Sequence, residues 1–129
     1  MKLVASPRRP AQDRTMALER ETALFGSRNR TAVLKAIRML EETYPSELAK
    51  LLGVRLFTVQ SILQSLEREG IVASRTVGRT RTVSLDPRYF AREELGALLW
   101  KLGHQDVGLQ NRLAGRRRRP RRVAKAGLS

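Results

Sequence analysis

Residues 46–72, with the sequence SELAKLLGVRLFTVQSILQSLEREGIV, decide the fold of this chain. Apolar residues recur at helical spacing in two runs, which predict a short helix over 46–52 and a longer helix over 56–69. The inward positions of the two helices are Leu48, Leu51, Leu52, Val59, Ile62, Leu63 and Leu66. Ser46 is expected to cap the start of the short helix, and Gly53 to end it in a left-handed conformation. A short helix, a turn that begins with glycine and a longer helix indicate a helix-turn-helix unit.

A further helix is expected upstream of this unit, over about residues 29–42. Its apolar positions share one face: Val33, Leu34, Ile37 and Leu40. Ser27 or Asn29 is suited to cap its start, and the Tyr44-Pro45 pair interrupts the helical pattern before the next element. The expected order is therefore helix, helix, turn, helix.

Downstream of the unit, the pattern changes to that of a β-hairpin. Residues 71–73 are short, apolar and β-prone, and the residues that follow alternate around Gly78, so that Val83 and Leu85 share one face. A last helix is expected over about 91–102. The predicted fold class is mainly α with a small β-hairpin, that is, a winged helix-turn-helix with flanking terminal helices.

Charge divides the 129 residues unevenly. The chain has 26 Lys and Arg against 12 Asp and Glu, a net charge of +14, and half of this excess lies in residues 115–129, which contain no acid. We expect a flexible N-terminal arm over 1–14, a folded domain over 15–102 and a basic, disordered tail over 103–129. Such a charge favours a polyanionic partner, because neutralising phosphates releases condensed counterions.

Several function classes find little support in the sequence. No run approaches the roughly 20 apolar residues of a membrane span, and the apolar run near the start is too short for a secretory signal, so we expect a cytoplasmic protein. Cysteine is absent and His104 is the single histidine, which disfavours a metal site or another cofactor. The paired acids Glu41-Glu42 and Glu93-Glu94 diverge on their helices, so we expect no acid–base dyad and no enzyme.

Residues 46–72 resemble winged helix-turn-helix regulators of the ArsR and MarR type. Those proteins show a comparable run, which here reads Glu47-Leu-Ala, a turn with Gly53, Thr58-Val, Leu63-x-x-Leu-Glu and Gly70-Ile-Val. The likeness extends from Leu24 to about Leu102. It implies a DNA-binding transcriptional regulator that dimerises through its terminal helices, with the interface formed by Leu95, Leu98, Leu99, Trp100 and Leu102. A second interpretation stays open for Leu95, Leu98, Leu99 and Trp100, namely that they complete the core.

The outward face of the 56–69 helix supplies the candidate base contacts. The polar residues on this face are Thr58, Gln60, Ser61, Gln64 and Ser65. Arg55 stands where such regulators usually place a capping Ser or Thr, and is a candidate phosphate contact. Phe57 is also a candidate base contact, although two interpretations stay open for Leu56 and Phe57: contact with thymine methyl groups, or packing against the N-terminal segment.

Arginines supply the remaining candidate contacts. Arg75, Arg79 and Arg81 surround the hairpin turn, where an inserted arginine gains from a narrow minor groove, and Arg28 and Arg30 are candidate phosphate contacts. Nonspecific contacts are expected from the tail residues Arg116, Arg117, Arg118, Arg119, Arg121, Arg122 and Lys125.

These residues favour a sequence-specific regulator of transcription, a homodimeric repressor that binds double-stranded DNA. The alternatives are a nucleoid or RNA-binding protein that uses the arginine tail without reading sequence, and a protein–protein adaptor.

Overall fold

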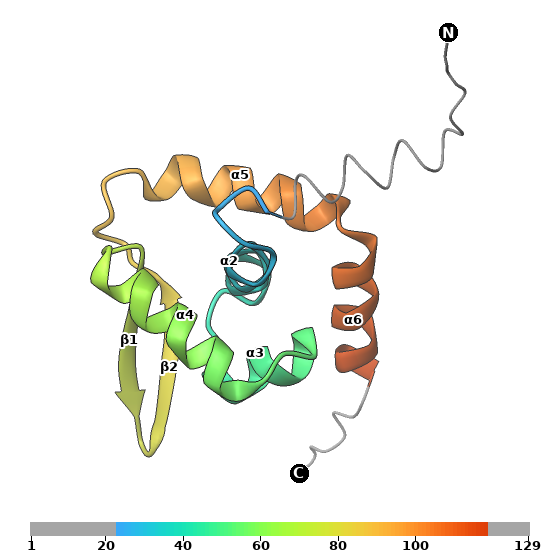
Figure 1. Cartoon of the computed structure of the whole chain (residues 1–129), viewed down its shortest axis with the longest axis horizontal. Helices are drawn as coiled ribbons and strands as arrows, with labels where there is room; N and C mark the ends of the chain where they lie inside the picture. Colours follow the sequence, from blue (N-terminus) through green and yellow to red (C-terminus); the bar gives the residue numbers. More distant parts are fainter. Residues whose placement is uncertain (1–22, 119–129) are drawn as a thin grey trace, which may run out of the picture.

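The computed structural model describes residues 23–118, which form five helices and a two-stranded sheet in this part of the chain (Figure 1). The elements are α2 (Arg28–Leu40), α3 (Pro45–Leu52), α4 (Leu56–Arg68), β1 (Val72–Val77), β2 (Thr80–Leu85), α5 (Arg92–Gln105) and α6 (Val107–Arg118). In Figure 1, α2 is seen end-on at the centre, with α5 on one side of it and α3 and α4 on the other.

The three helices of the helix-turn-helix region have distinct boundary signals. The Ser27 hydroxyl accepts a hydrogen bond from the Arg30 N–H at 3.0 Å, which identifies Ser27 as the cap of α2. Gly53 ends α3 with φ +67°, as expected of a left-handed cap. The prediction that Ser46 caps α3 is wrong. Tyr44 is the cap residue, it makes no side-chain bond, and Pro45 occupies the first helical position because its missing N–H costs nothing there.

The wing, defined here as the β1–β2 hairpin, is antiparallel with Val72 opposite Leu85 and Val77 opposite Thr80. Gly78 allows the tight turn because its φ of +64° is strained for other residues. The base of the wing is attached to the body by reciprocal backbone bonds between Thr43 and Val83. This bridge attaches the hairpin to the loop between α2 and α3.

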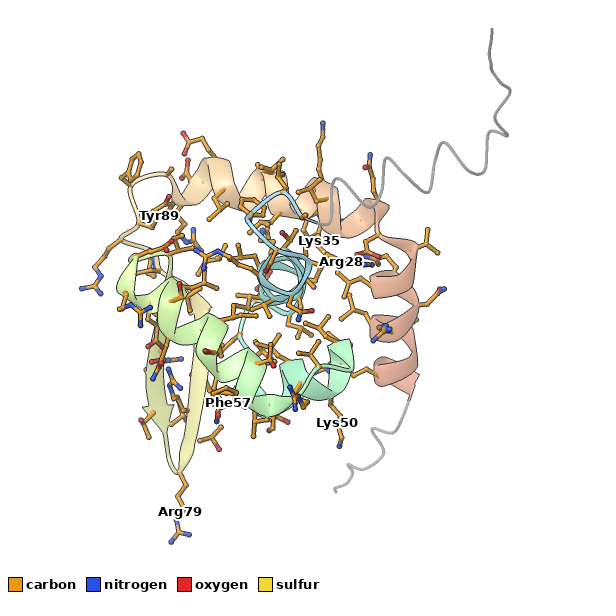
Figure 2. All side chains as sticks on the ribbon, in the orientation of Figure 1. Arg28, Lys35, Lys50, Phe57, Arg79 and Tyr89 are labelled. Atoms are coloured by element: carbon orange, nitrogen blue, oxygen red, sulfur yellow. The ribbon has the colours of Figure 1, made fainter. Side chains whose placement is uncertain are left out.

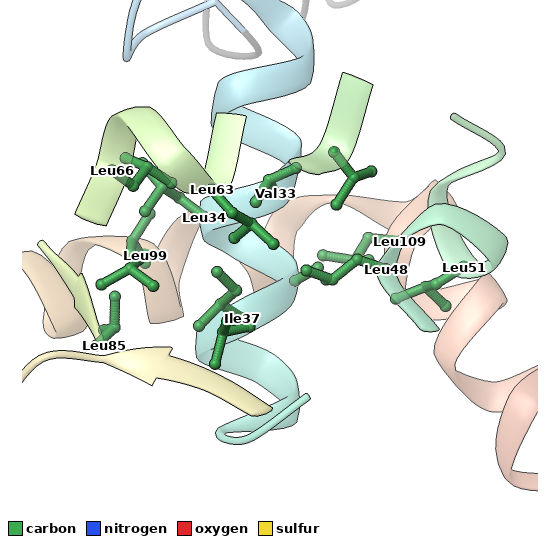
Figure 3. Packing of buried hydrophobic residues seen from close by; sticks show 14 of the residues in the cluster. Val33, Leu34, Ile37, Leu48, Leu51, Leu63, Leu66, Leu85, Leu99 and Leu109 are labelled. Carbon is green, nitrogen blue, oxygen red and sulfur yellow. The ribbon is translucent and has the colours of Figure 1, made fainter. Parts of the chain in front are cut away.

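One hydrophobic core fills the space around α2 (Figure 3). Helix α2 contributes Leu34 and Ile37, α4 contributes Leu63, and α5 contributes Leu99, all of which are almost fully buried. Because each of these elements buries one stripe in the same cluster, the orientation of α4 relative to the wing is set by packing. None of the described helices is long and apolar enough to cross a membrane.

The structure corrects the expected end of the domain. Residues 103–105 and 107–118 are helical instead of forming a loose tail, since α5 continues to Gln105 and α6 follows after Asp106. Leu109 and Leu113, only 4% and 3% exposed, extend the core along α6. The Asp106 carboxylate accepts the Leu109 N–H at 3.0 Å and so caps the start of this helix. The predictions for 1–14 and 119–129 lie outside the described residues.

Candidate nucleic-acid interface

The outward face of α4 is polar along its length and aromatic at its start. Gln60, Ser61 and Gln64 are exposed and Thr58 is half-buried, while Val59, Leu63 and Leu66 face the core. Phe57, the second residue of the helix, is 77% exposed. Helical spacing places Phe57, Ser61 and Gln64 in one line, because they are separated by four and seven residues.

Ser65 belongs to a contact within the protein. Its hydroxyl accepts a hydrogen bond from Arg30 Nη1 at 3.0 Å, and Arg30 Nη2 lies 2.6 Å from a Glu69 carboxylate oxygen. The Arg30 side chain is 20% exposed, so these two bonds tie α2 to α4. Arg30 and Ser65, both predicted DNA contacts, are thus joined to each other between α2 and α4.

The wing arginines differ in their partners. Arg79 lies at the tip of the hairpin, exposed, with no ion pair among the described residues (Figure 2). Arg75 donates to the Glu42 carboxylate at 3.0 and 3.3 Å, and Arg81 lies 2.5 Å from that of Glu67. The Arg81 pair fastens the wing to α4.

Arg75 and Glu42 form an ion pair at the surface of the hairpin. Hydrogen bonds from Arg75 and from the Thr82 hydroxyl lower the pKa of Glu42 below its usual value. Arg75 thus lies beside a carboxylate at the side of the hairpin, in a pair whose two side chains are both largely exposed.

One side of the molecule, which we call the candidate face, gathers the start of α4, α3 and the wing tip. Figure 2 shows Lys50, Phe57 and Arg79 all extending toward this side. Arg55, exposed at the α3–α4 turn, immediately precedes the start of α4. Sequence reasoning missed Lys50. Its signal was available, because Lys50 lies outside the inward Leu48 and Leu51 positions of the short helix.

Arg28 lies elsewhere. It is exposed at the start of α2 and, with Lys35 and Arg112, lines a cavity of about 260 Å³ beside α6. Figure 2 places it next to Lys35, away from the side on which Phe57 and Arg79 point. The structure therefore does not bring Arg28 together with the other predicted contacts.

Helix α6 holds the arginines nearest the tail against α3. Arg112 Nη1 donates to the Leu51 carbonyl at 3.0 Å, satisfying a free carbonyl at the end of α3. Arg116 Nε donates to the Glu47 carboxylate at 2.8 Å, so this predicted nonspecific contact is engaged within the protein. Arg117 and Arg118 end the described helix, and the remaining predicted tail contacts lie outside the described residues.

The predicted dimer residues separate into two groups. Leu99 is completely buried in the core, and Leu95 and Leu102 are partly buried, so Leu99 cannot form an exposed interface and that assignment is wrong. Leu98 and Trp100 are 41% and 46% exposed, but they are two residues apart and so lie on different sides of α5, with Trp100 beside Arg38 of α2. The sequence pattern could not separate the buried from the exposed positions of α5. Its apolar residues Leu98, Leu99 and Trp100 are consecutive and therefore point to different sides of the helix.

The single histidine and the acidic side chains of residues 23–118 are dispersed with respect to metal binding. No three acidic or histidine side chains in this range lie close enough to hold a metal ion. The His104 ring packs on Trp100 with centroids 4.1 Å apart, and Arg38 lies 4.8 Å from the Trp100 ring centroid. The described surface is thus organised around hydrogen-bonding and basic side chains.

Comparison with known proteins identifies the fold. The chain resembles the adhesin competence repressor AdcR from Streptococcus pyogenes, with a TM-score of 0.53, 15% identity and coverage of 82% of this chain and 78% of that chain. It also resembles the oxidised form of MarR from E. coli, with a TM-score of 0.51, 20% identity and coverage of 85% and 84%.

Neither a family model nor a curated protein sequence matches the chain. The structural likeness nevertheless spans most of both molecules and agrees with the predicted order of elements. The described chain therefore has a MarR-like winged helix-turn-helix fold.

Proposed function

We propose that this protein is a sequence-specific regulator of transcription that binds double-stranded DNA as a homodimer and represses its target. Helix α4 enters the major groove, and the wing lies on the adjacent minor groove or backbone. The observation that carries the proposal is that Lys50, Phe57 and Arg79 extend toward one side of the molecule (Figure 2), while the polar residues Gln60, Ser61 and Gln64 of α4 are exposed.

The dimensions of α4 suit this role. Its 13 residues make a rod of about 20 Å, and the major groove is about 12 Å wide. Gln60 and Gln64 lie one turn apart on the exposed face, and a glutamine amide can bond both the N6 and N7 positions of adenine. These side chains are the candidates for reading bases.

Cationic side chains around α4 are suited to hold its register. Arg55 and Lys50 are exposed beside the start of α4, and Arg79 extends from the wing at the other edge. Contacts of this kind position a protein on the duplex, whereas base contacts specify the sequence. Arg75 and Arg81 keep a secondary role, since each must share its charge with a glutamate of the protein.

The exposed apolar surface of α5 supports the dimer. Leu98 and Trp100 lie on a helix that Figure 1 places opposite the wing tip, which leaves the candidate face free. A two-fold axis through such a contact would set two α4 helices on one side, about one DNA turn apart, on an approximate palindrome. AdcR, a fold relative, is named a repressor, which is the basis for the proposed sign of regulation.

Selection of bound fragments from genomic DNA, followed by competition with random duplex at physiological salt, tests the proposal. A specific regulator should prefer its selected site by at least about a thousandfold. A ratio near unity would instead assign the protein to nonspecific nucleoid or RNA binding. A double variant, Arg79→Ala with Lys50→Ala, should lose affinity for all duplexes, and unchanged affinity would contradict the placement of the DNA contacts on the candidate face. An unmodified protein that binds no duplex would favour an adaptor role.

A further inference from the structure

We infer that Phe57 reads the 5-methyl group of a thymine in the major groove, which makes the protein sensitive to a methyl group that forms no hydrogen bond. This inference rests on the proposed function and specifies which feature of the DNA the start of α4 recognises. It concerns a side chain for which the sequence leaves two interpretations open.

Phe57 lies at the start of α4. It is the second residue of α4, and residues at the start of a recognition helix penetrate the groove most deeply. Its ring is 77% exposed, and in Figure 2 its label lies on the same side as Lys50 and Arg79. The neighbouring residue Leu56 is 43% exposed, so the tip of the helix is apolar over two successive side chains.

Phe57 is not part of the hydrophobic core. The face of α4 that packs inward carries Val59, Leu63 and Leu66, and each is fully buried. Phe57 instead belongs to the line that continues through Ser61 and Gln64 on the exposed face. The ring therefore contributes little to packing within the described residues, and with the exposed Leu56 beside it forms a small apolar patch at the start of α4.

The surface around the Phe57 ring is mostly polar. A shallow, open hollow of about 400 Å³ is lined by Phe57, Thr58, Ser61, Ile62 and Ser65 of α4 and by Ser27, Asn29 and Arg30 at the start of α2. Most of its lining is polar, with hydroxyl groups, one amide and one arginine, and Ile62 is the other apolar residue beside the ring. A mostly polar lining around an exposed ring is suited to a partner with an apolar group inside a hydrogen-bonding surface.

The major groove of DNA presents such a surface. Among the groups on its base edges, the thymine methyl is the apolar one, and apolar side chains recognise it by contact. Glutamines at positions 60 and 64 would read adjacent bases through hydrogen bonds, while Phe57 reads the methyl group. Cytosine methylated at C5 carries the same group at the same position and should substitute for thymine at this contact.

The test replaces each thymine of the selected site, one at a time, by deoxyuridine, which removes only the methyl group. For the unmodified protein, we expect one thymine per half-site at which the loss weakens binding about three- to fivefold, the amount corresponding to one buried methyl group. The Phe57→Ala variant should bind the site more weakly and should no longer distinguish thymine from deoxyuridine there.

Phe90→Ala is the matched control, because Phe90 is 91% exposed and its ring lies 5.1 Å from that of Tyr89, which Figure 2 shows far from Phe57. It should keep both the affinity and the methyl sensitivity of the unmodified protein. The Phe57→Leu variant, which retains an apolar tip, should keep part of the methyl discrimination.

Three results would overturn the inference. A selected site at which no thymine responds to deoxyuridine would refute the methyl contact while leaving specific DNA binding intact. A Phe57→Ala variant with a clearly lower Tm or a smaller mass in solution would show that the ring packs within the free chain or between copies. If no preferred site is selected at all, the proposed function and this inference fail together.

Discussion

The arginines of the helix-turn-helix region and wing differ in whether their charge is balanced within the protein. Arg30, Arg75 and Arg81 each meet a glutamate carboxylate, at 2.6, 3.0 and 2.5 Å. Arg55 and Arg79 have no such partner among residues 23–118. A paired arginine must leave or share its carboxylate to bind a phosphate, so the unpaired residues should contribute more to DNA affinity.

Arg79 in the hairpin turn and Arg81 in β2 allow a direct comparison of an unpaired and a paired arginine of the wing. Arg79→Ala should weaken binding to all duplexes about three- to tenfold and leave Tm unchanged. The slope of log affinity against log salt concentration should become shallower by about 1, the amount expected for one lost phosphate contact. Arg81→Ala should have a smaller effect on affinity and should lower stability by about 0.5 kcal/mol, because it removes the partly exposed bond to Glu67. Binding titrations at several salt concentrations and thermal melts measure both, and the opposite ranking would contradict the assignment.

Gln60 offers the corresponding prediction for base reading. Gln60→Ala should reduce discrimination at one base position by about 1–3 kcal/mol and leave affinity for random duplex almost unchanged. Repeating the fragment selection with the variant measures this change. Gln105→Ala, an exposed glutamine at the end of α5, is the control. A Gln60 variant with unaltered preference would show that this side chain faces only solvent.

At the scale of elements, the helix-turn-helix unit was predictable because its signals are local. Apolar spacing placed α2, α3 and α4 within two residues of their observed ends, and Gly53 and Gly78 marked the cap and the hairpin turn. Each of these signals depends on residues close in sequence. The same locality explains why the MarR-like fold was recognisable without any close sequence relative.

Helix α6 was missed because its composition resembles a solvated tail. Its sequence, VGLQNRLAGRRR, has two glycines and four arginines, and only Leu109 and Leu113 are buried. The available signal was the spacing of these leucines, four residues apart, after the capping residue Asp106. The ion pairs of the candidate face were not predictable either, because Arg30 and Glu69 are 39 residues apart and meet only in the folded chain.

The Lys35–Asp106 pair is the element-scale contact with a measurable pH dependence. Lys35 is 5% exposed in its side chain and lies 2.9 Å from Asp106. Burial raises the pKa of Asp106, but the hydrogen bonds from Lys35 and from the Leu109 N–H outweigh it, so the pKa is lowered overall. Because the folded pKa is below the unfolded value of about 3.9, this contribution is present above that pH and is lost as pH falls through the folded pKa.

Two substitutions of Asp106 separate its charge from its capping role. Asp106→Asn should lower the free energy of unfolding by about 1–3 kcal/mol at pH 7, because it leaves the Lys35 ammonium without a counter-charge. Asp106→Ala should cost about 1 kcal/mol more, because the cap of α6 is lost as well. In denaturant titrations, the difference between the unmodified protein and Asp106→Asn should shrink below about pH 4. A pH-independent difference would contradict the ionised pair.

At the scale of the whole molecule, the proposed DNA and dimer surfaces lie on opposite sides of α2 (Figure 1). Leu98→Glu introduces a charge on the exposed surface of α5 and should convert the dimer to a monomer in analytical ultracentrifugation, with specific DNA affinity reduced at least tenfold. Val77→Glu, at an exposed apolar residue of the wing, should leave the mass unchanged. A dimer that persists in Leu98→Glu would place the interface elsewhere.

Two truncations distinguish the structural from the electrostatic part of the C-terminal region. A chain that ends after Arg118 keeps Leu109, Leu113 and the Arg116–Glu47 pair, and loses four cations, at residues 119, 121, 122 and 125. Its Tm should be unchanged, and its affinity should fall evenly for all duplexes. The slope of log affinity against log salt concentration should become shallower by at most about 3.6, because each of four phosphate contacts contributes about 0.9.

A chain that ends after Gln105 should behave differently, because it exposes core surface that α6 covers. Loss of the buried Leu109 and Leu113 side chains should cost about 3–6 kcal/mol, comparable to the whole stability of a small domain, so this chain should be largely unfolded by circular dichroism. If it instead remained folded and bound its site with normal preference, α6 would be an appendage. If the cut after Arg118 changed the preferred sequence, the tail would read bases, and sequence recognition could not be assigned to α4 alone.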